Sequence, residues 1–302
     1  MLPPSALLAP RYWPTWLGLG LLRLTSQLPY RQLLALGRGV GWVALHLLPQ
    51  RRRIAATNIA RCFPERDAEW QRQLLRDHFA ALGISLFELA LSCWASERRL
   101  APLGHLHGLE HLHQALAQGS GVILLSAHLL PLDIGGRLLP RQLPLSVFYR
   151  AHKNAVIEWV WAGHRRRHVE QAIPSSAIKS ALRVLRGGGV LWYAPDQNTT
   201  PREAVFANFF TIPAATNSGT ARLARLTGAR VVPYRAVRRR DGSGYDLFID
   251  PPLAHYPSGD LQADTQRIND LIEQWVRRDP EQYLWVHRRF RHRPNRDDPP
   301  FY

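Results

Sequence analysis

The chain has 302 residues, of which 46% are hydrophobic, and its formal net charge is +16. This length and composition allow a large buried core and exclude a disordered chain. Of the 39 basic residues only Lys153 and Lys179 are lysines, so arginine carries nearly all of the positive charge. Because the arginine fork binds phosphate and carboxylate through paired hydrogen bonds, this charge suits anionic headgroups, nucleic acid or an acidic protein. An arginine-rich genome would explain the ratio of arginine to lysine but not the net charge.

The first 50 residues form the most apolar part of the chain. Between Trp13 and Leu48 there is no acidic residue, and the interior charges are Arg23, Arg31 and Arg38. Residues 13–28 are barely long enough to cross about 30 Å of hydrocarbon. This pattern favours a single membrane crossing or a pair of helices lying in the membrane interface, with a buried core helix as the third interpretation. The basic run Arg51–Arg53 that follows is typical of a cytoplasmic flank.

The remainder of the chain alternates between helix-like and strand-like segments. Apolar spacing predicts helices at Arg72–Ser92, His111–Gln118, Val156–His168, Ser176–Arg186, Ser218–Thr227 and Asp264–Arg278. Short apolar runs predict strands at Val122–Ser126, Leu145–Tyr149, Val190–Ala194, Arg230–Val237 and Tyr245–Ile249, and a last short element at Glu281–His287. We therefore predict an α/β fold with a mainly parallel sheet flanked by helices, preceded by an N-terminal membrane helix.

The first predicted strand leads into the strongest candidate for a catalytic site. His128 follows the strand directly, and Asp133 lies five residues further on, after Pro131. Since proline favours the first helical position, His128 is expected in the strand-to-helix turn and Asp133 in the first helical turn. The carboxylate would then reach back and orient the imidazole, leaving its other nitrogen free to take a proton from a hydroxyl. Taken alone, this His-x₄-Asp spacing is a weak pattern.

Two cysteines, Cys62 and Cys93, lack both metal-ligand spacing and the density of a disulfide scaffold. They are expected to be buried, apolar and reduced. We predict no metal and no cofactor.

Several ordered blocks of sequence resemble the late acyltransferases of bacterial lipid A biosynthesis, especially the lauroyl-transferring type, within the lysophospholipid acyltransferase-like superfamily. The resemblance covers nearly the whole chain. The blocks are PRYWPTWLGLGLL (10–22), TNIARCFPE (57–65), SAHLLPLD (126–133), FYRAHKN (148–154), WYAPDQN (192–198) and PEQYLWVHRRFRHRP (280–294).

This resemblance implies transfer of an acyl group from acyl carrier protein to a hydroxyl of a Kdo2-lipid IVA-like precursor. It makes His128 the base, Asp133 its orienting acid, and Arg150, Asp196 and Asn154 substrate-binding residues. It also implies an inner-membrane location with the catalytic domain facing the cytoplasm. Residues 1–50 are then the membrane-anchoring segment and residues 51–302 the acyltransferase domain. The partners implied are acyl carrier protein, a phosphorylated glycolipid and the inner membrane, without nucleic acid.

The chain departs from the family pattern at a few positions. Ala151 replaces a proline after Arg150, Asn198 stands where a second acid is common, and Thr199-Thr200 replaces an aromatic or histidine followed by glycine. Asp133 replaces the glutamate often found in the lauroyl type. Arg150 and Asp196 have an alternative interpretation as a salt bridge that braces two loops.

Two other functions compete with this interpretation. A glycerolipid acyltransferase shares the His-x₄-Asp spacing, and a non-catalytic protein bound to anionic membranes would explain the charge. Three arginine clusters are candidate anion-binding surfaces or merely solvated basic faces: Arg165–Arg167, Arg238–Arg240 and Arg288-Arg289-x-Arg291. Three aromatic residues are either an acyl-chain pocket or plain core: Phe206, Phe209 and Phe210.

Overall fold

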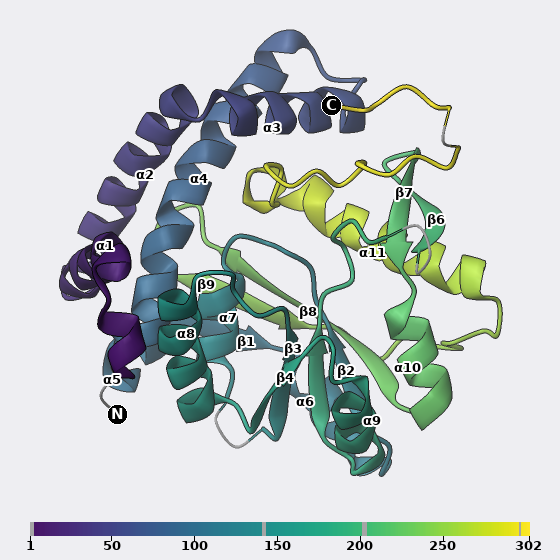
Figure 1. Ribbon diagram of the computed structural model, residues 1–302. Helices are drawn as coiled ribbons and strands as arrows, with labels where there is room; N and C mark the ends of the chain where they lie inside the picture. The colour runs from purple at the N-terminus through teal and green to yellow at the C-terminus, as the bar shows by residue number, and fades with distance from the viewer. Residues whose placement is uncertain (1–2, 141–142, 201–203, 296) are drawn as a thin grey trace.

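The computed structural model describes residues 3–140, 143–200, 204–295 and 297–302, and it is built around one seven-stranded sheet. The strand order is β1-β9-β8-β2-β5-β3-β4, and all neighbours are parallel except β8 and β9. The strands are β1 (Gly104–His107), β2 (Val122–Leu125), β3 (Leu145–Tyr149), β4 (Gln171–Pro174), β5 (Val190–Tyr193), β8 (Arg230–Arg238) and β9 (Tyr245–Ile249). Helices cover both faces (Figure 1). The predicted α/β class with a mainly parallel sheet is confirmed.

Strand β2 lies in the middle of this sheet, between β8 and β5. Its four residues alternate between two hydrophobic clusters, with Val122 and Leu124 on one face and Ile123 and Leu125 on the other. All four are fully buried. A strand buried on both faces needs a continuous apolar run, and this run is why β2 could be predicted as a strand. The residues that follow β2 therefore lie at the carboxyl end of the sheet's central strand.

The helices predicted after residue 70 are present, with their ends shifted by a few residues. The helices are α1 (Trp13–Thr25), α2 (Tyr30–Leu47), α3 (Pro49–Cys62), α4 (Ala68–Trp94), α5 (Glu97–Leu100), α6 (Leu109–Ala117), α7 (Leu132–Leu138), α8 (Ala155–His168), α9 (Ile178–Arg186), α10 (Gly219–Thr227) and α11 (Leu261–Arg278). The predicted last short element is a 3₁₀ turn at Pro280–Gln282. Helix α4 runs alongside α2 (Figure 1).

A two-stranded hairpin that was not predicted lies outside the main sheet. It consists of β6 (Ala204–Phe209) and β7 (Ile212–Asn217), and it packs on α11. Phe209 and Phe210 are buried here in the core cluster that includes Trp285. Neither they nor Phe206 line the catalytic cavity described below. Phe209 and Phe210 therefore support the interpretation as core, whereas Phe206 is only half-buried on β6.

The N-terminal helices do not have the form that was predicted for a membrane crossing. Helix α1 has 13 residues, and the chain then turns at residues 26–29 before α2 begins. Among the described residues, no helix combines the length and the apolar character that a bilayer crossing needs. The N-terminal membrane helix in the predicted fold is therefore not shown.

Glycines allow α2 to pack very closely against α4. Gly37 and Gly41 on α2 meet Gly83 on α4, and a Cβ at any of the three would collide with backbone atoms of the other helix. We expect Gly83→Ala to lower the free energy of unfolding by about 1–3 kcal/mol, because the helices must separate to admit the methyl group. Gly39→Ala, whose Cβ would meet open space, is the matched control on α2. Urea unfolding measures both variants, and equal stability would contradict the close packing.

Candidate active site

His128 lies where its sequence predicted, in the turn between β2 and α7. Pro131 is the residue before the first turn of α7, and Asp133 lies within that turn. The carbonyl of His128 accepts a hydrogen bond from the Leu284 N–H at 3.2 Å, so the C-terminal segment supports the turn. Both placements predicted from Pro131 are confirmed.

The carboxylate that orients His128 is Asp196 and not Asp133. The distance from Asp196 Oδ1 to His128 Nδ1 is 2.6 Å, and Asp196 Oδ2 accepts the backbone N–H of His128 at 2.9 Å. Asp196 follows β5, which pairs directly with β2, so both residues emerge at the same edge of the sheet. Within the described residues Asp133 makes no hydrogen bond to His128, although the two interact electrostatically. The predicted hydrogen bond from Asp133 is therefore wrong.

Charge and burial set the protonation of this pair. Burial acts to lower the pKa of His128, but the charge and hydrogen bond of Asp196, with a smaller contribution from Asp133, raise it overall. Burial acts to raise the pKa of Asp196, but the interactions with His128 hold it below its usual value. Asp196 is only 2% exposed, so it stays ionised because of its partner. The ring's Nδ1 is thus a hydrogen-bond donor to Asp196, which leaves Nε2 as the available base.

Asp133 has a different environment, because it faces the cavity beside His128. Its enclosure by protein raises its pKa, while Arg165 and His128 act in the opposite direction. Asp133 therefore influences the charge of His128 without fixing the orientation of its ring.

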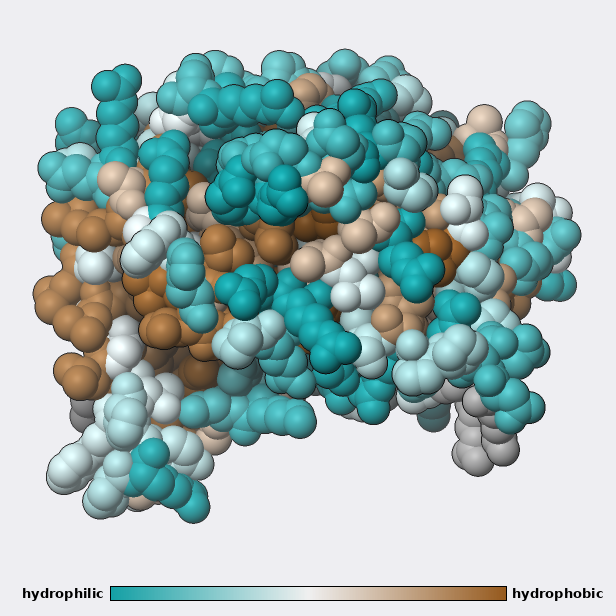
Figure 2. Space-filling model, turned by 90° about the horizontal axis from the view of Figure 1, so that it is seen from above, coloured by the Kyte–Doolittle hydropathy of each residue, from teal (hydrophilic) through white to brown (hydrophobic). Residues whose placement is uncertain are grey.

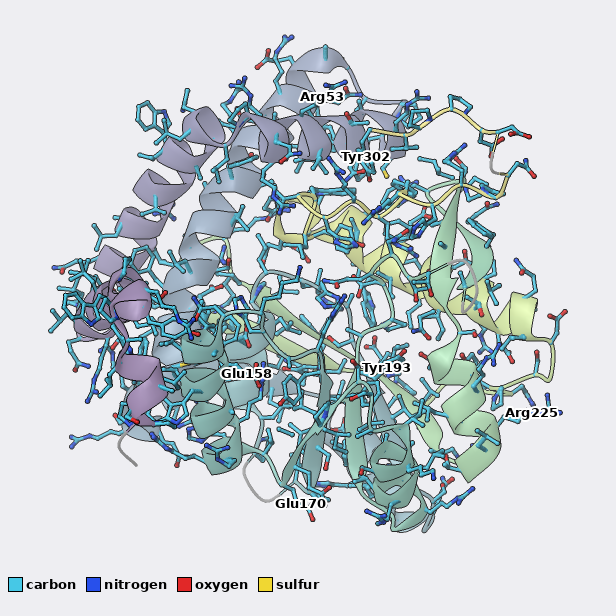
Figure 3. All side chains as sticks on the ribbon, in the orientation of Figure 1. Arg53, Glu158, Glu170, Tyr193, Arg225 and Tyr302 are labelled. Carbon is cyan, nitrogen blue, oxygen red and sulfur yellow. The ribbon has the colours of Figure 1, made fainter. Side chains whose placement is uncertain are left out.

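A cavity of about 500 Å³ opens in front of His128. It lies at the carboxyl ends of β3 and β5 and against α7 and α8, and its wall includes Tyr149, Trp161, Trp192, Tyr193 and Arg165. Figure 3 labels Tyr193, the last residue of β5, and Glu158 on α8. Glu158 accepts a hydrogen bond from the Tyr149 hydroxyl at 3.0 Å. The cavity combines an apolar wall with arginines and one oriented histidine, which is a suitable setting for acyl transfer.

Two of the other predicted site residues occupy different positions. Arg150 lines the cavity, and among the described contacts it forms no salt bridge with Asp196. Asn154 instead caps α8, since its Oδ1 accepts the N–H groups of Val156 and Ile157. Its amide also donates to Thr15 of α1 at 3.0 Å. The structure therefore gives Asn154 a supporting position outside the cavity lining.

A second histidine, His287, belongs to the C-terminal segment and interacts electrostatically with His128 and Asp196. Its Nε2 accepts the backbone N–H of Asn198 at 3.0 Å, and burial lowers its pKa to about 4. Asn58 holds this segment, because its amide donates to the carbonyls of Trp285 and His287 at 2.7 and 2.9 Å. The Tyr302 hydroxyl in turn bonds Asn58 at 2.6 Å, and Figure 3 shows Tyr302 beneath α3. Asn58 and His287 both lie within the sequence blocks that resemble the family. Their spacing along the chain, however, does not predict the hydrogen bond between the Asn58 amide and the His287 carbonyl.

Asn198 and Thr199, which depart from the family pattern, are both held by contacts with His292. Asn198 lines the cavity, its Oδ1 accepts the N–H of His292 at 3.3 Å, and the ring of His292 is 2.8 Å from the carbonyl of Thr199. An amide at position 198 is therefore part of an ordered network.

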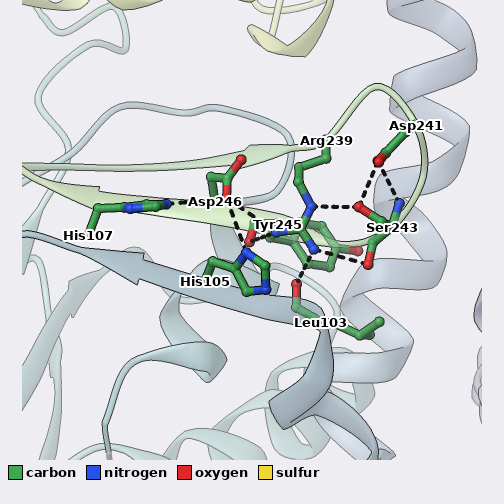
Figure 4. Close-up of polar contacts among 8 residues, drawn as sticks. All are labelled: Leu103, His105, His107, Arg239, Asp241, Ser243, Tyr245 and Asp246. Carbon is green, nitrogen blue, oxygen red and sulfur yellow. Dashed lines mark hydrogen bonds and ion pairs between the residues drawn. The ribbon is translucent and has the colours of Figure 1, made fainter.

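The three arginine clusters are not equivalent. Arg238 is buried and forms an ion pair with Glu88 at 2.6 Å. Arg239 bonds Ser243, Asp246 and the backbone around them (Figure 4). Arg289 is buried and donates to the Ala215 carbonyl and the Thr216 hydroxyl. In these two clusters several guanidinium groups are thus occupied within the protein, which corrects their interpretation as open anion-binding surfaces.

Comparison with known proteins places the chain in a family. A model of the bacterial lipid A biosynthesis acyltransferases matches residues 4–292. The lipid A biosynthesis lauroyltransferase of Escherichia coli (strain K12) is 38% identical over 291 residues, which cover 96% of this chain and 95% of that protein. The palmitoleoyltransferase of the same organism is 38% identical over 288 residues, or 95% of this chain and 94% of that protein. A lipid A biosynthesis acyltransferase of Haemophilus influenzae is 31% identical over 299 residues, or 98% and 96%. The chain belongs to the bacterial lipid A biosynthesis acyltransferases.

Proposed function

We propose that this acyltransferase moves a fatty acyl group from an acyl carrier protein thioester to a hydroxyl of a Kdo2-lipid IVA-like lipid A precursor. The observation that carries the proposal is the His128–Asp196 pair at the edge of an apolar, arginine-bearing cavity. A phosphorylated glycolipid and an acidic carrier protein both suit a chain with a net charge of +16.

In this mechanism His128 is the general base. Its Nε2 takes the proton of the acceptor hydroxyl while the hydroxyl oxygen attacks the thioester carbonyl. The new C–O bond forms, the C–S bond breaks, and the carrier's thiolate leaves without needing a proton. The developing oxyanion requires hydrogen-bond donors, and Arg150 and Arg165 line the same cavity. These arginines and Asp133 are the residues that we propose to contact the substrates.

The N-terminal helices support an association with the membrane surface. Large apolar side chains are exposed along α1 and α2, including Trp13, Leu17, Leu21, Leu24, Val40, Trp42, Val43 and Leu47. Figure 2 shows them as a brown area on the side of the molecule where these helices lie. An apolar surface of this kind, with arginines and no acids between residues 13 and 48, suits insertion into an anionic membrane interface. We propose that residues 1–50 anchor the protein in this way at the cytoplasmic face of the inner membrane.

Mass spectrometry of the product tests the proposed reaction. Purified protein is incubated with a tetra-acylated, sugar-bearing lipid A precursor and a mixture of acyl carrier proteins of defined chain length. We expect one added acyl group and a preferred chain length. The same chains presented as coenzyme A thioesters are the control for the donor, and lysophosphatidate is the control for the acceptor. Acylation of lysophosphatidate but not of the lipid A precursor would overturn the proposal.

A further inference from the structure

A second cavity lies on the far side of α8 from the catalytic histidine. It measures about 470 Å³ and is formed by α1, the end of α4, and α8. We call it the α1–α8 groove, and its lining includes Trp16, Gly20 and Arg23 of α1, Trp94 of α4, and Trp159 and Arg166 of α8. Trp16 and Trp159 make an edge-to-face contact at 6.0 Å. Three tryptophans thus give the groove an apolar wall.

The groove adjoins both the catalytic cavity and the apolar outer surface. His164 lines the catalytic cavity as well as the groove. On the other side, Trp16, Gly20 and Arg23 also line a shallow depression along α1, which continues over exposed leucines such as Leu21. The three hollows therefore follow one another from the surface of α1 to the site of His128, with His164 between the last two.

The charge of the groove is entirely positive. It contains Arg23, Arg166 and Arg167 and no acidic residue. Arg23 and Arg166 are exposed, and among the described residues neither guanidinium group has an ion pair or a hydrogen bond. Guanidinium groups beside an apolar wall match a molecule that joins an anionic headgroup to a hydrocarbon chain.

We propose that the α1–α8 groove holds an acyl chain of the phosphorylated acceptor lipid, with Arg23 and Arg166 binding its phosphate. This inference rests on the proposed function. The acceptor is the fitting occupant because the groove opens on the apolar face of α1, where a lipid leaves the bilayer. The donor chain, in contrast, is delivered by a soluble carrier protein. His164 is then the partition between the bound chain and the catalytic cavity.

Two glycines of α1 provide a matched test. A Cβ at Gly20 or at Gly18 would meet no atom within 4 Å, so both helix positions accept a larger side chain. Only Gly20 lines the groove. The probe is a phosphatidate with a diazirine in one acyl chain, presented in vesicles, and the adducts are mapped by mass spectrometry. We expect adducts on α8 and on the end of α4 in the wild type and in Gly18→Leu, and at least fivefold fewer of them in Gly20→Leu.

A second pair of variants tests the arginines. The double variant Arg23→Gln/Arg166→Gln should also reduce labelling several-fold. Arg225→Gln, an exposed arginine on α10 far from α1 in Figure 3, should leave it unchanged. Unlabelled tetra-acylated precursor should compete with the probe. Labelling of α8 that persists in Gly20→Leu, or a wild type without adducts on α8 and on the end of α4, would overturn the inference.

The result also separates the groove from the proposed reaction. Wild-type acylation of the precursor together with unchanged labelling of Gly20→Leu would reject the groove and keep the proposed function. Loss of labelling in Gly20→Leu, with no acylation of the precursor by the wild type, would keep the groove and reject the proposed function.

Discussion

Replacing His128 by alanine is expected to lower kcat for acyl transfer by a factor on the order of 10²–10⁴, the usual contribution of a general base. The imidazole is the group that Asp196 holds at the edge of the cavity. His287 is not a substitute, because its Nε2 accepts the backbone N–H of Asn198. The KM for the acceptor should change little, since His128 is small relative to the lining of the cavity.

Single-turnover acylation of the precursor measures this loss without interference from product release. His113→Ala is the control, because His113 is an exposed histidine on α6. Unfolding of His128→Ala should be followed in parallel to show that the variant is folded. A folded His128→Ala protein that transfers acyl groups at the wild-type rate would refute the mechanism.

How well the sequence predicted this site depended on whether the relevant contacts were local. The apolar run Val122–Leu125 and the nearby Pro131 place His128 and Asp133 correctly, because strand, turn and helix are all set within twelve residues. The bond between His128 and Asp196 spans 68 residues. It follows from β2 and β5 being neighbours in the sheet, and periodicity does not reveal the order of strands.

Other parts of the fold lacked a clear local signal. Strand β1 has four residues, two of them histidine, and it exists because it pairs with β9 at the edge of the sheet. The N-terminal region, in contrast, has a strong local signal, because its apolar composition alone suggested a membrane crossing. The glycines of α2 instead let one side of that helix bury against α4, while Trp42 and Val43 remain exposed on the other side. The apolar residues of α2 thus form two surfaces, one buried against α4 and one exposed.

Replacing Asp196 by asparagine is expected to be nearly as damaging as losing His128, with kcat lowered by a factor on the order of 10³. The carboxylate accepts two hydrogen bonds from His128, one from Nδ1 and one from the backbone N–H. Asparagine has a single side-chain oxygen, so its amide must face one of these donors. The ring is then released or held in the tautomer that puts the proton on Nε2, where the base is needed.

Asp133→Asn is the matched comparison, because it removes a neighbouring carboxylate that contributes charge but makes no hydrogen bond to His128 in the described structure. We expect a smaller loss of kcat in this variant and a change in its pH profile. Since Asp133 helps to raise the pKa of His128, its removal should lower that pKa. The base is active when deprotonated, so the acidic limb of kcat against pH should move to lower pH.

The wild-type enzyme should also lose activity on the acidic side of its pH profile. Because the pKa of His128 is raised overall, activity should fall as the pH drops through that raised value, and it should be fully present above it. The rates of wild type, Asp196→Asn and Asp133→Asn are to be compared over the full acidic limb. If Asp133→Asn loses more kcat than Asp196→Asn at its best pH, with the KM of both substrates unchanged, then Asp133 and not Asp196 orients the base during catalysis. Such a result would mean that the ring of His128 turns toward α7 when the substrates bind.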